Sequence, residues 1–282
     1  MNNVGGSEGK KMSKRLKTVL FAALLVGAGF FFGTICRQIG HAYELIFAPS
    51  GELLTLLLWF LLAAGAVVVS AGLVTALVRP VWVGFIAFAL SGLAMLLGWQ
   101  VAIVSGILVV VYLLAACAYA EGVVRELSER IRFSMRAIRA GQRILLMALA
   151  LVACGSLYMG YAAHIEQEGF SLPEVYTEVF MEQLEKQIEA RVPAEEREEV
   201  VSEFREGFQR IVDEFVEQGV KPYEWLIPLV VAAGLFMPLV TITGLLAWVP
   251  TAILSLVFRL LTVLGVTKVV SETQEIEKLV ID

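Results

Sequence analysis

Long runs of apolar residues without any charge are the feature that most constrains this chain. Residues 53–78, for example, contain no Asp, Glu, Lys or Arg. A bilayer has a hydrocarbon core about 30 Å thick, which a helix crosses with about 20 apolar residues. Backbone groups in lipid must find their hydrogen bonds within the protein, and helices satisfy this condition. The sequence therefore predicts an all-α polytopic membrane protein.

Six apolar runs are predicted to cross the membrane. They occupy residues 18–36, 53–78, 81–97, 101–120, 144–163 and 225–247. The first five belong to a membrane domain at 18–163, and the C-terminal membrane segments occupy 225–266. Residues 1–17 are expected to be a disordered basic N-terminus and 267–282 a tail. Within the first run, Gly29 and Gly33 form a GxxxG pair, which permits the close approach of another helix.

The distribution of Lys and Arg predicts the orientation of these spans. Five basic residues lie in 10–17, and six arginines lie in 121–143. Cytoplasmic loops carry an excess of Lys and Arg close to the ends of spans. Placing the N-terminus in the cytoplasm puts both clusters inside and residues 164–224 outside. We therefore expect a multi-pass protein of a plasma (inner) membrane.

The last apolar segment, 251–266, is ambiguous. Arg259 at its middle would cost about 2.5 to 3.5 kcal/mol at the centre of a bilayer. Thr251, Ser255 and Thr262 lie on the same helical stripe as Arg259, so the segment is amphipathic. Such a segment lies in the interface, or it crosses as a seventh span with the stripe toward other helices. The two alternatives place the C-terminus on opposite sides of the membrane.

The segment 164–224 differs in composition from the rest of the chain, with 17 acidic and 6 basic residues. Its apolar residues recur at helical spacing on either side of Pro193, which predicts an extracytoplasmic helical hairpin. The second helix carries apolar residues at spacings of three and four, the seam of a coiled coil. The residues of this seam are Val201, Phe204, Phe208, Ile211 and Phe215. The seam packs within the hairpin, or it leaves an edge through which 173–218 contacts a second copy or another membrane protein.

Residues 121–143 are predicted to form a cytoplasmic amphipathic helix rich in arginine. Each arginine close to an anionic membrane surface contributes about 1 kcal/mol of binding. The candidates for anionic-lipid contact are Arg130, Arg132, Arg136, Arg139 and Arg143. The alternative is a stiff connector whose charges only follow the positive-inside rule.

Residues that carry chemistry are scarce. The two histidines, His41 and His164, fall just outside the spans, and the three cysteines lie in or at the edge of apolar runs. The sequence has no P-loop, no H-E-x-x-H and no G-x-S-x-G motif. We therefore expect no catalytic residue, cofactor or metal, and no nucleic-acid partner, since no binding motif accompanies the arginines.

Two functions fit these observations. One is a structural or accessory role, as a scaffold or complex subunit whose external hairpin contacts other proteins. The other is that of a transporter, or its membrane subunit, for an apolar or lipid-like substrate, because the spans offer no counter-ion for a polar one. Arg259 is the one charge that lies inside an apolar run away from its ends.

Overall fold

The computed structural model describes residues 5–43, 45, 51–78, 80–129, 135–170, 202, 207–208, 210–211, 214 and 216–264. Over these residues the regular structure is entirely helical. Six segments of the described chain are long and apolar enough to cross a membrane. These segments are Leu16–His41, Gly51–Leu77, Val81–Gly98, Ile103–Glu126, Gly141–Glu168 and Gln218–Val263. The prediction of an all-α polytopic membrane protein is thus confirmed.

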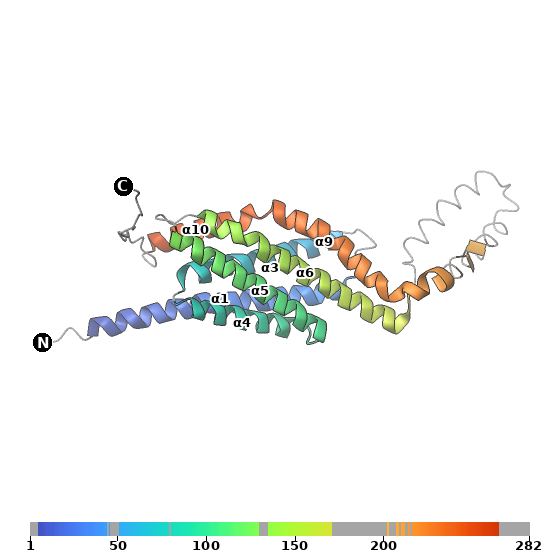
Figure 1. The fold of residues 1–282 in the computed structure, drawn as a ribbon, viewed down its shortest axis with the longest axis horizontal. Coiled ribbons are helices and arrows are strands. Elements are labelled where there is room, and N and C mark those ends of the chain that lie inside the picture. The colour runs from blue at the N-terminus through green and yellow to red at the C-terminus, as the bar shows by residue number, and fades with distance from the viewer. Residues whose placement is uncertain are drawn as a thin grey trace, which may run out of the picture.

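The helices lie roughly along one long axis (Figure 1). The elements are α1 (Gly5–His41), α3 (Gly51–Leu77), α4 (Val81–Gly98), α5 (Ile103–Glu129) and α6 (Met135–Glu168). A π-helical turn, η1 (Val216–Val220), and a 3₁₀ turn, η2 (Lys221–Leu226), lead into α9 (Ile227–Leu245) and α10 (Trp248–Val263). We call the end of the bundle at which α1 begins the basic end. The opposite end, at His41 and His164, is called the histidine end.

Helix α6 is the central element of the bundle. It packs against α1, α5 and α9, while α1 packs against α3 and α4. In its most apolar stretch 67% of the residues are buried, compared with 17% in the segment that contains α9 and α10. Gly169, with a φ of 76°, ends α6 in the left-handed conformation that glycine adopts readily. The far end of α6 is tied to η2, because the backbone N–H of Phe170 donates to the Glu224 carboxylate.

Small residues let α1 approach its neighbours closely. A Cβ added to Gly29 would lie 2.4 Å from Ser91 Oγ, and one added to Gly33 would lie 2.2 Å from the Met95 carbonyl oxygen. At the histidine end a Cβ on Gly160 would lie 1.8 Å from the Gly40 carbonyl oxygen. The GxxxG pair predicted in the first run therefore forms the contact between α1 and α4, as in close-packed membrane helices.

One prediction about the ends of the chain differs from the structure, and one open question is narrowed. Helix α1 begins at Gly5, so residues 5–17 are helical rather than disordered as expected. Helix formation propagates at little cost from an existing helix, and 5–17 contain no proline to stop it. The last apolar segment does not reverse direction: α10 follows α9 after the turn Leu246–Ala247, and the chain bends there but continues toward the same end of the bundle (Figure 1). Helix α10 therefore ends at the basic end and adds no seventh crossing.

The arginine-rich segment is not one separate helix. Residues 121–129 continue α5 and residues 135–143 begin α6, and these two helices pack against each other. The expected helix over 121–143 is therefore wrong, because both flanking spans extend past their apolar runs. Similarly, α6 continues through residues 164–168, so the acidic insert begins at Gly169 rather than at His164. Residues 171–200, which hold most of the predicted hairpin, lie outside the described chain.

Candidate functional site

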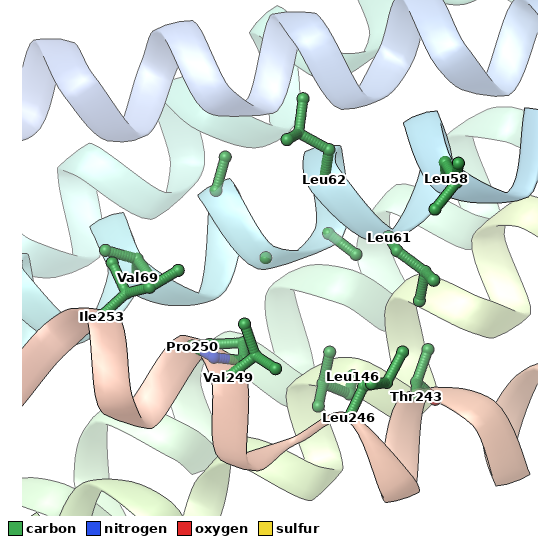
Figure 2. Close-up of a pocket in the computed structure, with 13 residues that line it drawn as sticks. Leu58, Leu61, Leu62, Val69, Leu146, Thr243, Leu246, Val249, Pro250 and Ile253 are labelled. Atoms are coloured by element: carbon green, nitrogen blue, oxygen red, sulfur yellow. The ribbon is translucent and has the colours of Figure 1, made fainter. Parts of the chain in front are cut away.

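A groove runs between α3 and the α9–α10 segment, with α6 at its floor. It has a volume of about 410 Å³, within the range of about 300 to 1,000 Å³ that ligand pockets span. Leu58, Leu61, Leu62 and Val69 of α3 line one wall, and Figure 2 shows Leu61 directed toward the α9–α10 segment. The residues on that opposite wall are Thr243, Leu246, Val249, Pro250 and Ile253.

The groove lies where α9 gives way to α10. Proline has no N–H, so Pro250 cannot donate to the carbonyl oxygen of Leu246, one turn earlier. That oxygen instead accepts from Val249 N–H at 2.9 Å, which tightens the chain locally. The α-helical ladder is thus interrupted at Leu246–Ala247, opposite the central part of α3.

The facing part of α3 leaves the groove open at Gly65. No atom lies within 4 Å of where a Cβ on this glycine would stand. Leu58 and Leu62, which form the rim on α3, are 60% and 58% exposed. The groove is therefore open along the outer surface of the bundle, the surface that faces lipid in a membrane protein.

The chemistry of the groove is almost purely apolar. Thr243 carries the only polar side chain among the described lining residues. Its hydroxyl already donates within α9, to the carbonyl oxygen of Leu239 at 2.8 Å. Water needs two to four polar partners to be held in a cavity, and the described side chains of this groove offer only the hydroxyl oxygen of Thr243 as an acceptor. Its walls fit an apolar occupant.

Few of the residues predicted for protein contact fall in the described chain. Phe208 is half-buried and Ile211 is 67% exposed. Val201, Phe204 and Phe215 lie outside the described residues. The coiled-coil seam over these five positions stays a prediction.

The predicted lipid-contact arginines flank the connection between α5 and α6 at the basic end. Arg130 and Arg132 lie outside the described residues. Arg136 and Arg139 belong to the first turns of α6, and Arg143, further along that helix, has an exposed side chain. Arg259 is exposed on α10, so this charge does not enter the core of the bundle.

Sequence patterns could not point to the groove. Leu, Ala and Val line it, and the same residue types fill the core beside it. Two signals were nevertheless present in the sequence: Pro250, which interrupts a helix, and Gly65 in the middle of an apolar run. Among the described residues, no three His, Cys, Asp or Glu side chains form a group that could hold a metal ion.

Comparison of this chain with protein-family models, with curated proteins and with solved structures gave no match.

Proposed function

We propose that this membrane protein binds an apolar, lipid-like ligand in the groove between α3 and α9–α10. Such a ligand is the substrate class expected for the second of the two functions that the sequence suggested, a transporter or its membrane subunit. The observation that supports it is the groove itself, an open and almost wholly apolar cavity of about 410 Å³ beside the central part of α3.

An acyl chain is the occupant that fits these walls. The groove opens on the outer surface of helices that are apolar enough to cross a membrane. In a bilayer the molecules that reach such a surface are lipids, and apolar contacts there gain from close packing rather than from the exclusion of water. A linear hydrocarbon chain can lie along the groove and pack against Leu62, Val249 and Ile253.

A polar or charged ligand does not suit this site. Carriers of such ligands keep ionisable residues inside the membrane as partners for the charge. The groove contains no charged side chain among its described lining residues, and its single hydroxyl is already bonded. Binding is the step that the groove supports; transport of the ligand would be a second step, which a flux assay measures.

Photocrosslinking tests the proposal. The full chain is reconstituted in vesicles with a phosphatidylcholine that carries a diazirine in one acyl chain, and crosslinked peptides are mapped after illumination. We expect crosslinks at Leu62 and Val249 in excess of those at Ile107, an exposed residue of α5 that reports contact with bulk lipid. Gly65→Phe fills the groove and should abolish the excess.

Gly234→Phe is the matched control. Gly234 lies on α9 outside the groove, and like Gly65 it has no atom within 4 Å of an added Cβ. This variant should keep the crosslinks at Leu62 and Val249. Labelling of the groove at the level of Ile107, or labelling that Gly65→Phe leaves unchanged, would refute lipid binding there. Crosslinks from groove residues to another protein would indicate a partner helix instead.

A role as a complex subunit is the second candidate. The described residues of the acidic insert lie beyond the bundle at the histidine end, and Ile211 on its predicted seam is 67% exposed (Figure 1). An apolar seam on a charged helix, as predicted for this segment, is typical of a surface that pairs with another helix. The paired change Phe204→Ser and Phe208→Ser should lower the mass of the detergent-solubilised complex in light scattering. An unchanged mass would count against this role.

We also propose that the basic end faces the cytoplasm of a cell with a plasma (inner) membrane. The lysines and arginines of 10–17 and 121–143 support this orientation through the positive-inside rule. The arginines next to the α5–α6 connection would then contact anionic lipids of the inner leaflet.

A further inference from the structure

A second, polar pocket lies at the histidine end of the bundle, built from residues that the sequence keeps far apart. Its volume is about 380 Å³. Helix α1 contributes Arg37 and His41, the α4–α5 turn contributes Gln100, and α6 contributes His164 and Gln167. Both histidines of the chain thus line one pocket.

Packing holds the two main walls together. Gly40 and Gly160 bring the backbones of α1 and α6 into contact, so no side chain separates the helices there. Ser156 adds a hydroxyl that donates to the carbonyl oxygen of Cys36 on α1. Contacts of this kind make the pocket a fixed feature of the fold rather than a gap between loosely packed helices.

The side chain of His164 is held in place by its neighbours. Its Nδ1 lies 2.9 Å from the hydroxyl of Tyr43, a residue 121 positions earlier in the chain. The Tyr43 ring lies against the His164 ring, with centroids 4.6 Å apart, and stacks on Tyr161 at 5.5 Å. When Tyr43 donates to Nδ1, the His164 proton lies on Nε2, which remains a hydrogen-bond donor.

His41 is oriented in a similar way. Its Nδ1 donates to the carbonyl oxygen of Arg37 at 2.7 Å, so Nε2 is the ring nitrogen left for a ligand on this exposed, pocket-lining residue. The two histidines and Arg37 are therefore the side chains that could contact a charged ligand in this pocket.

The charges of the pocket favour an anion. Arg37 carries a permanent positive charge, and each histidine offers a ring N–H as a further donor or, when protonated, a second positive charge. Of the described residues that line the pocket, none is acidic. A carboxylate oxygen of Glu168 lies 3.7 Å from His164 Nδ1, on a side chain that is 70% exposed. The amides of Gln100 and Gln167 add neutral donors.

The position of the pocket indicates where such an anion would come from. Trp99, which also lines it, follows directly after α4 at the end of a span. The ends of transmembrane helices reach the headgroup region of a bilayer, so the pocket lies at the level of lipid phosphates. Arginine binds phosphate through two parallel hydrogen bonds, which gives both affinity and geometry.

From this arrangement we infer that the pocket between α1, the α4–α5 turn and α6 binds a phosphate group through Arg37, His41 and His164. The phosphate belongs to a lipid headgroup or to a free phosphate ion. The site shares no residue with the apolar groove, so the inference holds whether or not the groove binds lipid.

Calorimetry on the full chain in a non-ionic detergent tests the inference with two probes, inorganic phosphate and short-chain dihexanoyl phosphatidylglycerol. We expect saturable binding of at least one probe, weakened about tenfold or more by Arg37→Gln and by His164→Gln. Arg143→Gln is the control, because it removes an exposed arginine at the basic end. This variant should bind the probes with the affinity of the wild type.

The two probes distinguish the sources of the phosphate. Binding of both probes indicates a site for free phosphate, and binding of the lipid alone indicates a headgroup site. The inference is overturned if neither probe binds the wild type, or if Arg37→Gln and Arg143→Gln bind with the same affinity. Circular dichroism of each variant checks that the helices are intact, and Arg37 has an exposed side chain whose shortening removes no core contact.

Discussion

Gly33 of α1 lies directly against the backbone of Met95 in α4. A Cβ on Gly33 would stand 2.2 Å from the carbonyl oxygen of Met95 and 3.0 Å from its carbonyl carbon. Both contacts are with main chain, which cannot rotate out of the way as a flexible side chain can. The two helices could accommodate a methyl group here only by moving apart.

We therefore expect Gly33→Ala to lower the free energy of unfolding by about 1 to 3 kcal/mol, the usual cost of overpacking a well-packed contact. Titration with SDS in mixed micelles, followed by circular dichroism, measures this change. Gly27 is the matched control, because it lies on the same helix and nothing lies within 4 Å of an added Cβ. Equal stability of Gly33→Ala and Gly27→Ala would show that α1 and α4 do not pack in this way.

Ser91 offers a test of polar contacts inside the bundle. Its hydroxyl donates across to the carbonyl oxygen of Leu25 at 3.1 Å and lies 3.3 Å from the hydroxyl of Tyr112. Hydrogen bonds between membrane helices contribute about 0.6 kcal/mol on average and about 1.7 kcal/mol at most. Ser91→Ala should lower the free energy of unfolding by an amount in this range, measured as above.

Ser70 is the control for this prediction. It is also fully buried, but its hydroxyl donates to Ala66 within its own helix, at 2.7 Å. Because no helix–helix bond is lost, Ser70→Ala should change the stability by less than Ser91→Ala. The reverse order would contradict the role assigned to Ser91.

The spans were predictable because one property, the length of an apolar run, decides them. The third apolar run was predicted at 81–97, and α4, Val81–Gly98, ends one residue beyond it. Helix ends beyond the apolar runs were harder to place, since a helix does not stop where hydrophobicity stops. Both α5 and α6 continue into the arginine-rich segment, through Glu129 and from Met135.

The two pockets could not be predicted for a different reason. Sequence spacing placed His41 and His164 outside the spans, but it carried no information on which ends of which helices are neighbours. The two histidines meet because Gly40 contacts Gly160. These glycines are 120 positions apart in the sequence, so no local spacing pattern links them. The groove escaped prediction because apolar side chains serve equally well in a core and on a surface that faces lipid.

A hydrogen bond holds α10 to α6. The Thr251 hydroxyl donates to Gln142 Oε1 at 2.8 Å, and Gln142 is buried. Thr251→Val should speed amide hydrogen exchange in α10, because this helix would open more often from the bundle. Gln142→Leu should have a similar effect, and the double variant should add little to either.

Thr241→Val is the control. It removes an exposed hydroxyl bonded within α9 and should leave exchange in α10 unchanged. Additive effects of the two changes would show that the bond does not couple the helices.

The orientation of the bundle is tested by labelling single cysteines. Cys36, Cys117 and Cys154 are first replaced by alanine, and cysteines are then introduced at Val200 and Val280. In intact cells a membrane-impermeant maleimide should label position 200 and leave position 280 unlabelled, because we expect the acidic insert outside and α10 to end at the cytoplasmic, basic end. Inside-out vesicles should reverse the pattern.

Labelling of both positions from outside would mean that the chain between them crosses the membrane an even number of times, contrary to the single passage of α9 and α10. Protection of position 200 in intact cells together with its labelling in inside-out vesicles would invert the proposed orientation.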